Sequence, residues 1–199
     1  MKSIDIKGTA RTETGKKATK AIRNEGAVPC NLYGEARDKS GLPVALSFSA
    51  TAAELRKLVY TPDIYSVNLD IDGKKYKAVM RELQFHPVTD QLLHIDFYEI
   101  NDKKPIIMEV PIKLNGLAEG VRAGGKLAAN VRKLKVRAPY TQIPERLEID
   151  VTELGLGKTI KAGELKFEGL ELITPASVVV CQVKMTRSAM SAAAKAQQQ

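Results

Sequence analysis

The sequence is poor in the residues that build metal, redox and catalytic sites. Its 199 residues include no tryptophan, two cysteines and two histidines, and aromatic residues make up only 5% of the chain. Cys30 and Cys181 are too few for a disulfide framework and each lies in an apolar run, so we expect buried free thiols and a reducing compartment. Two histidines without a carboxylate or thiol at ligand spacing predict no metal site. No motif of a catalytic nucleophile accompanies them.

Long apolar runs are also missing. No stretch approaches the about 20 apolar residues that cross a bilayer. Residues 1–7 alternate apolar and polar side chains and contain no apolar core of the signal-peptide kind. We therefore expect a soluble, cytoplasmic protein without a membrane partner. The 44% of hydrophobic residues are enough for one large or two small packed domains.

Positive charge is what the sequence has in excess. Thirty-one Lys and Arg residues against 23 Asp and Glu give a formal net charge of +8 and a pI near 9.4. Such an excess favours a polyanionic partner, although many basic proteins bind no nucleic acid. The charge is concentrated, because residues 7–23 hold six basic side chains and one acid, and residues 122–137 hold six and none.

Strand patterns dominate residues 1–98, which we assign to a first domain. Residues 66–71 alternate apolar and polar side chains, as expected of a half-buried strand. Asp72-Gly73 follows, and this dipeptide predicts a type I′ hairpin leading into a strand at 74–80. Residues 92–98 form another predicted strand.

Two short helices are predicted in the same domain. The first covers residues 16–24 and ends at Gly26, at or just past its C-cap. The second covers residues 52–60, with an apolar stripe facing the core. Thr51 and Glu54 have the spacing of a capping box, in which each side chain satisfies a backbone donor of the other.

A second, mostly β domain is predicted at 105–186, after a boundary near Asn101–Pro105. Four segments there have strand patterns, separated by Gly and Pro: 106–114, 131–138, 147–151 and 178–183. The segment Gly155–Thr159 lacks the full spacing of a phosphate-binding loop and predicts a turn. Residues 187–199 are rich in Ala, Ser and Gln, so we expect a disordered tail.

The basic segment near the N-terminus is the first candidate binding surface. Lys16, Lys20 and Arg23 share one face of the predicted helix, because their spacings are four and three. Arg11 lies at the end of the strand before it. This pattern favours contact with phosphates, which is strong, salt-dependent and not base-specific by itself. An ordinary solvated helix face is the alternative.

The second candidate surface is a set of hydrogen-bonding side chains on strands. His94 and Asp96 are two apart and face the same way, and Gln84 offers both a donor and an acceptor. Such a set can interact with base edges and ribose hydroxyls in the wide minor groove of RNA. Tyr33, at a strand end, can stack on a base or pack against its neighbours.

Two other interpretations of His94 and Asp96 stay open at this point. The histidine can be an ordinary surface residue bonded to its neighbour. The pair can also belong to a hydrolase triad, but no nucleophile accompanies it. In the second domain, Lys133, Lys135 and Arg137 alternate outward on a strand. They either contact a partner molecule or form a solvated sheet face.

The order and spacing of these motifs resemble one protein family. The chain is similar to the bacterial large-subunit ribosomal proteins that bind 5S rRNA, the ribosomal protein L twenty-five or general stress protein CTC family. The resemblance covers residues 4–98 and lies in Arg11, Gly15-Lys16, Arg23, Gly26, Pro29, Tyr33-Gly34, Gln84-Phe85-His86-Pro87 and His94-Ile95-Asp96-Phe97. Residues 105–186 resemble the additional C-terminal β-domain of the long members, through Gly116, Gly120, Gly124-Gly125, Pro144-Glu145 and Val151-Thr152-Glu153-Leu154.

The resemblance implies a mainly β fold: a six-stranded N-terminal barrel with short helices and a mostly β C-terminal domain. It implies a structural constituent of the large ribosomal subunit, not an enzyme, that binds the loop E region of 5S rRNA. Magnesium would be bound by the rRNA and no cofactor by the protein, which would be a monomer off the ribosome. The implied RNA contacts are Arg11, Lys16, Lys20, Arg23, Tyr33, Gln84, His94 and Asp96.

Three helix positions depart from the family pattern. Lys20 stands where arginine is frequent, Lys17 replaces a common small residue and Ala21 replaces a common basic one. A lysine gives a point charge in place of a planar fork. A tRNA-binding module is the alternative function, because related barrels form the anticodon-binding part of glutaminyl-tRNA synthetase.

Overall fold

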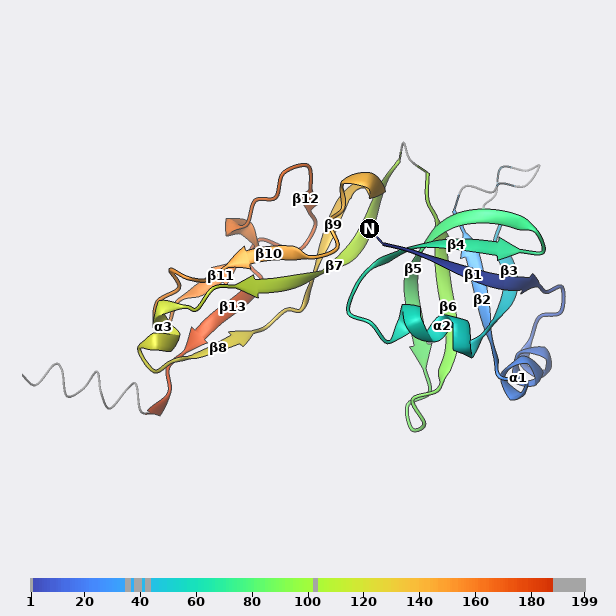
Figure 1. The fold of residues 1–199 in the computed structure, drawn as a ribbon, viewed down its shortest axis with the longest axis horizontal. Helices are drawn as coiled ribbons and strands as arrows, with labels where there is room; N and C mark the ends of the chain where they lie inside the picture. Colours follow the sequence, from blue (N-terminus) through green and yellow to red (C-terminus); the bar gives the residue numbers. More distant parts are fainter. Residues whose placement is uncertain (1, 35–36, 38–40, 42–43, 102–103, 188–199) are drawn as a thin grey trace, which may run out of the picture. The chain divides into compact units, whose positions relative to one another are not determined.

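The structure is a computed structural model that describes residues 2–34, 37, 41, 44–101 and 104–187. It divides into two compact units (Figure 1). The first comprises Met1–Ile106 with Pro139–Thr141, and the second comprises Ile107–Ala138 with Gln142–Gln199. Of the tail expected at 187–199, only Arg187 lies within the described residues. The domain limits expected from the sequence stay predictions.

A closed six-stranded barrel forms the first unit, as the family resemblance implied. Its strands follow one another in the order β1-β3-β2-β6-β5-β4, and β4 closes onto β1 in parallel. The strands are β1 (Lys2–Ala10), β2 (Ala27–Tyr33), β3 (Leu46–Thr51), β4 (Tyr65–Ile71), β5 (Lys74–Phe85) and β6 (Leu92–Glu99). Closure leaves the barrel without a free strand edge, so its backbone groups are paired around the whole circumference.

Alternation of side chains fills the barrel, as the pattern in residues 66–71 predicts. Val67, Leu69 and Ile71 of β4 are all buried, at 0–2% exposure. Phe48 of β3 and Phe97 of β6 are fully buried and their ring centroids lie 5.7 Å apart. Outward-facing positions of the same strands stay available for polar side chains.

Both predicted helices are present at one end of the barrel, together with the loop between β5 and β6 (Figure 1). Helix α1 (Lys16–Asn24) ends before Gly26, whose φ of 78° is the left-handed conformation expected past a helix end. Helix α2 (Ala52–Val59) buries Leu55 and Leu58 in the barrel core. Helix α1 has no fully buried residue, so the barrel packs against it less closely.

One helix-cap prediction is wrong. Thr51 and Glu54 do not exchange bonds with each other's backbone, and the N-terminus of α2 has no side-chain cap. Instead, the Thr51 hydroxyl donates directly to the Glu54 carboxylate over 3.0 Å. The predicted hairpin is confirmed, because Asp72 and Gly73 both have positive φ, 49° and 82°, between β4 and β5.

The second unit contains two small sheets. One is four-stranded in the order β10-β7-β9-β12 and the other is three-stranded in the order β11-β13-β8. The strands are β7 (Pro105–Asn115), β8 (Lys126–Ala129), β9 (Lys133–Pro139), β10 (Leu147–Asp150), β11 (Thr159–Lys161), β12 (Glu171–Leu172) and β13 (Val179–Lys184). The remaining elements of this part of the chain are α3 (Glu119–Arg122) and the 3-10 turns η1 (Tyr140–Gln142) and η2 (Ala162–Glu164), and the first two residues of η1 belong to the first unit.

Four strands of this unit, β7, β9, β10 and β13, match the predicted segments. The sequence analysis missed β8, β11, β12 and α3, which are two to four residues long. β11 and β12 complete less than two periods of alternation and α3 is about one helical turn, so no local pattern marks them. β8 is as long as β10, but its sequence Lys-Leu-Ala-Ala does not alternate apolar and polar side chains. The turn predicted at Gly155–Thr159 is present, with Gly157 at φ 73° leading into β11.

Among the described residues, no helix has both the length and the apolar character that crossing a membrane requires.

Candidate nucleic-acid interface

Arg11 lies directly after β1, where its backbone N–H donates to the Ser47 carbonyl over 3.0 Å. Two nitrogens of its guanidinium, Nε and Nη1, are buried and have no hydrogen-bond partner among the described residues. A buried donor without an acceptor costs free energy, and more so when it belongs to a charged group. Arg11 is therefore held in a position where an incoming acceptor would be favourable.

Strand β6 displays the predicted pair on the outside of the barrel. Ile95 and Phe97 point inward and are fully buried, so His94 and Asp96 point outward. The His94 Nδ1 lies 3.6 Å from Asp96 Oδ1, and their side chains are 18% and 22% exposed. Gln84 of β5 lies opposite His94 in the register of the two strands. The three predicted polar residues therefore share one sheet face.

The environment of His94 keeps its ring neutral. Burial lowers the pKa of His94 below its ordinary value, and the cations Arg11 and Arg23 lower it further, whereas Asp96 raises it. The net direction is down, so the ring is uncharged at pH 7. A neutral imidazole has one donor and one acceptor nitrogen, which suits hydrogen bonding to a base edge.

Arg23 ties helix α1 to this face. Its Nε and Nη2 both donate to the Leu93 carbonyl, over 3.1 and 3.0 Å. Leu93 directly precedes His94, so the basic helix and the polar strand face lie on one side of the barrel. Part of the Arg23 guanidinium is thus used to position the helix, a role that the sequence analysis did not assign.

Lys16 and Lys20 continue the positive charge away from the sheet. Both are exposed on α1. Lys20 is one turn and Lys16 two turns from Arg23, the latter a distance of about 10 Å along the helix axis. Lys17 and Ala21, the departures from the family pattern, are also exposed. No buried group depends on them.

Tyr33 ends β2 beside the same face. Its ring meets that of Tyr98 edge to face, with centroids 5.9 Å apart and planes at 72°. Burial raises the Tyr33 pKa, and Asp96 raises it further, so the phenol stays protonated near pH 7 and keeps its donor. The guanidinium of Arg81 lies 5.9 Å from the Tyr98 ring centroid, within reach of a cation–π contact.

The structure adds residues that the sequence analysis overlooked. Asn31 of β2 lies opposite Asp96 in the register and accepts a hydrogen bond from the Ser47 hydroxyl over 3.0 Å. Glu82 of β5 lies opposite Asp96 on the other side. The signal for Asn31 was available, because it stands between the inward-facing Cys30 and Leu32 and must point outward. That for Glu82 was hidden by a bulge in β5.

The basic strand of the second unit has carboxylates close to its cations. Lys133, Lys135 and Arg137 are exposed on β9, as their alternation predicted. However, Glu109 lies 3.8 Å from Lys135, and Glu171 lies 3.9 Å from Arg137. These carboxylates offset the charge, which favours the solvated sheet face over an anion-binding one. Within the described ranges, no group of three His, Cys, Asp or Glu side chains is placed to hold a metal ion.

Comparison with known proteins identifies the family. The sequence model of the Ribosomal L25p family matches residues 6–97, and that of the ribosomal protein TL5 C-terminal domain matches residues 105–187. The large ribosomal subunit protein bL25 of Phocaeicola vulgatus is 63% identical over 196 residues, covering 98% of this chain and 99% of that protein. The chain belongs to the bL25 family of ribosomal proteins.

Other bL25 proteins match over similar lengths. That of Bacteroides thetaiotaomicron is 56% identical over 201 residues, covering 98% of this chain and 99% of its own. That of Porphyromonas gingivalis is 52% identical over 198 residues, covering 99% and 100%. As a bL25 family member, the chain is a structural protein of the large ribosomal subunit and not an enzyme. The hydrolase interpretation of His94 and Asp96 is therefore wrong.

Proposed function

We propose that this bL25 family member binds 5S rRNA in its loop E region. Helix α1 would lie along the phosphates and the outer face of β2, β5 and β6 would enter the groove. The observation that carries this proposal is that two guanidinium nitrogens of Arg11, close to His94, are buried and have no hydrogen-bond partner among the described residues.

Arg11 gains most from an anionic or carbonyl acceptor. The guanidinium of Arg11 lowers the pKa of both His94 and Cys30, so it lies near both side chains. A phosphate oxygen or a base carbonyl reaching Nε and Nη1 would supply the missing bonds in a partly water-excluded position. Charge-assisted bonds of this kind are about twice as strong as neutral ones.

The helix face and the strand face of the interface would contact different parts of the RNA. Lys16, Lys20 and Arg23 carry fixed positive charge along one helix face and suit phosphates, which position an RNA without specifying its sequence. Gln84, His94 and Asp96 together offer donors and acceptors to base edges and ribose hydroxyls. The wide, shallow minor groove of an RNA helix is the surface such a face can reach.

The protein would act alone in solution and without a cofactor. The closed barrel has no free strand edge through which copies could pair, so pairing of copies through the barrel's strands is not expected, and the protein would be a monomer off the ribosome. Magnesium at the interface would belong to the rRNA. The place of action is the ribosome, in the cytoplasm, where the second unit would contact neighbouring rRNA or ribosomal proteins.

The test is a competition among RNAs. Binding of the full chain to 5S rRNA, to a tRNA and to a plain hairpin is measured at matched salt. We expect a clear preference for 5S rRNA, and we expect His94→Ala or Asp96→Ala to reduce that preference. A preference for tRNA would support the anticodon-barrel alternative, and equal affinity for all three would exclude specific recognition.

A further inference from the structure

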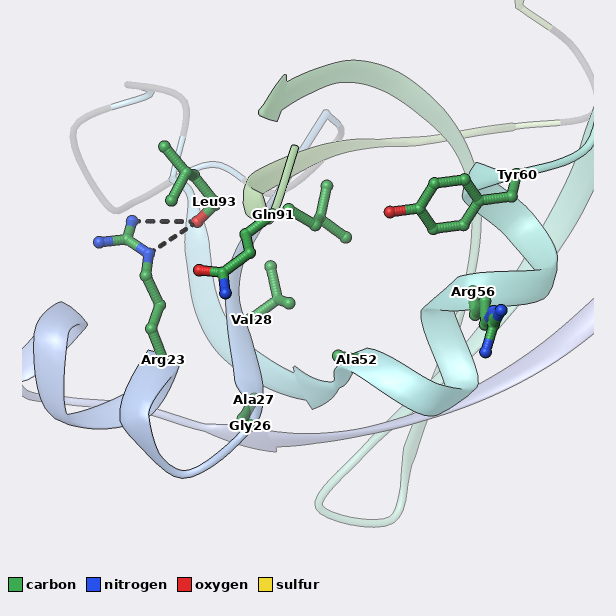
Figure 2. Close-up of a pocket in the computed structure, with 10 residues that line it drawn as sticks. Arg23, Gly26, Ala27, Val28, Ala52, Arg56, Tyr60, Gln91 and Leu93 are labelled. Carbon is green, nitrogen blue, oxygen red and sulfur yellow. Dashed lines mark hydrogen bonds between the residues drawn. The ribbon is translucent and has the colours of Figure 1, made fainter. Parts of the chain in front are cut away.

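A pocket of about 700 Å³ opens at the end of the barrel that carries both helices. Figure 2 shows Arg23 and Arg56 on opposite sides of it, with the Tyr60 hydroxyl directed toward its middle. Val28 and Ala52 form part of its floor. The volume lies in the range of small-molecule sites, about 300–1,000 Å³. None of the residues named so far as RNA contacts, apart from Arg23, lines it.

The lining combines an apolar floor with cationic and hydrogen-bonding walls. Arg23 and Arg56 bring two guanidinium groups, Gln91 an amide and Tyr60 a phenol, and none of the described residues that line the pocket is a carboxylate. Gln91 offers both a donor and an acceptor, as the edge of a nucleobase requires. The guanidinium groups suit a phosphate on either side.

Exposed aromatic rings border this pocket. Tyr60 is 63% exposed and Phe85 is 40% exposed, and their ring centroids lie 6.4 Å apart. The two rings are adjacent and exposed in a protein with few aromatic residues, and adjacent exposed apolar groups are found at interaction sites. Flat rings beside guanidinium groups are typical of proteins that stack unpaired nucleotides.

The pocket is continuous with the proposed RNA interface through Arg23. This residue holds α1 against the Leu93 carbonyl, and both Arg23 and Leu93 line the pocket. An RNA strand whose phosphates follow the Lys16–Arg23 face therefore reaches the pocket mouth at the C-terminal end of α1.

We propose that the pocket receives one unpaired nucleotide of the RNA that the polar face binds. The base would stack against Tyr60 with its edge at Gln91, and Arg56 would meet its phosphate. This inference rests on the proposed function and adds a second subsite to it. A peptide of a neighbouring protein is the competing occupant. Two guanidinium groups, no carboxylate in the lining and the shared Arg23 favour the nucleotide.

Filling the pocket gives the sharpest test. Ala52 and the adjacent Ala53 are both exposed on α2, but only Ala52 lines the pocket. Ala52→Leu places three additional carbons in the pocket without changing charge, and Ala53→Leu is the matched control. Both positions lie in the first turn of α2, where leucine is a good helix former. Tyr60→Ala and Tyr60→Phe test the stacking surface independently, because only phenylalanine retains a ring.

The measurements are the affinity of each full-length variant for 5S rRNA and the chemical reactivity of unpaired nucleotides in the complex. We expect Ala52→Leu and Tyr60→Ala to weaken binding at least about fivefold, the lower end of the cost of losing one base–aromatic stack. One or two nucleotides protected by the wild type should become reactive. Ala53→Leu, whose position does not line the pocket, should bind and protect as the wild type does. Tyr60→Phe keeps the stacking ring and loses only the hydroxyl, so it should lose less affinity than Tyr60→Ala.

Each other outcome overturns the inference. If all four variants bind and protect like the wild type, the pocket holds no nucleotide, while the proposed function stands. If Ala52→Leu binds free 5S rRNA normally but enters assembled large subunits poorly, the occupant is a protein. If the wild type itself shows no preference for 5S rRNA, the proposed function and the subsite fall together.

Discussion

Arg23 links the fold of the barrel to the proposed RNA contact. Its two bonds to the Leu93 carbonyl join residues 70 positions apart in the chain, and they hold an exposed helix that has no fully buried residue. Arg11 is the opposite case, because its guanidinium has nitrogens that no described residue satisfies. The first arginine places the helix, and the second is left ready for a ligand.

Substituting Arg23 should separate these roles. Arg23→Ala removes one cation and the helix anchor, so we expect weaker RNA binding and a salt dependence lower by about one unit of slope. Arg23→Lys keeps the charge but cannot donate two hydrogen bonds from one planar group to the Leu93 carbonyl. The slope of the salt dependence should therefore stay unchanged while the affinity for RNA falls. Affinity for 5S rRNA across a salt series measures both. Lys126→Ala, a cation of β8 in the second unit, is the control, and an equal loss there would contradict the assignment.

His94 should make stability depend on pH. Its pKa in the folded protein is lowered from the ordinary 6.5, first by burial. Below pH 6.5 the unfolded chain therefore binds more protons than the folded one, and the free energy of unfolding falls as the pH decreases toward the folded pKa. Urea unfolding between pH 8 and pH 5 measures this. His94→Asn should show a shallower decline, and an unchanged decline would place the effect elsewhere.

Elements in this protein differ in how tightly their packing constrains them. Helix α1 tolerates the departures Lys17 and Ala21 because both are exposed. In the second unit, by contrast, α3 meets the Gly155-Leu156 backbone so closely that a Cβ on Gly120 would lie 2.7 Å from two backbone atoms. This contact requires glycine for its lack of volume, since Gly120 has no left-handed φ.

Gly120→Ala should therefore destabilise the second unit. Backbone atoms cannot move aside as a flexible side chain can, and overpacking of this kind costs about 1–3 kcal/mol. Gly155→Ala is the matched control, because a Cβ there would meet only Lys158 Cγ at 3.6 Å, an ordinary contact. Thermal or urea unfolding of the two variants measures the difference. Equal stabilities would show that α3 can shift without cost.

At the scale of the whole molecule, the chain forms two separate hydrophobic cores, one in each unit. The barrel buries its own cluster, centred on Phe48, Phe97 and Leu69. The second unit buries a different set that includes Val110, Leu134 and Val180. Each core contains one free cysteine, Cys30 in the barrel and Cys181 in the second unit.

The two thiols should report unfolding of the two units separately. Burial raises the pKa of Cys30 to about 12 and also raises that of Cys181, so neither forms the reactive thiolate at pH 8 while folded. Alkylation along a urea series, followed by mass spectrometry of each peptide, should give two different midpoints. In Cys181→Ala the Cys30 profile should be unchanged. A single shared transition would mean that the two units unfold as one.

The local elements were predictable because their causes are local. A period of two marks β4, positive φ at Asp72 and Gly73 marks its hairpin, and spacings of four and three put Lys16, Lys20 and Arg23 on one helix face. The predicted capping box is wrong although its residue types and spacing are right. The Thr51 and Glu54 side chains bond to each other and not to the backbone.

The sequence by itself determined which residues alternate, where turns fall and which side chains are polar on exposed faces. Tertiary structure alone decided which of these meet. Closing the barrel brings the Leu93 carbonyl to Arg23 and Asn31 beside Asp96, and it creates the pocket between the two helices. Pairing β9 with β12 places Glu171 opposite Arg137. Such contacts depend on strands distant in the chain, and local periodicity contains no information about which distant strands become neighbours.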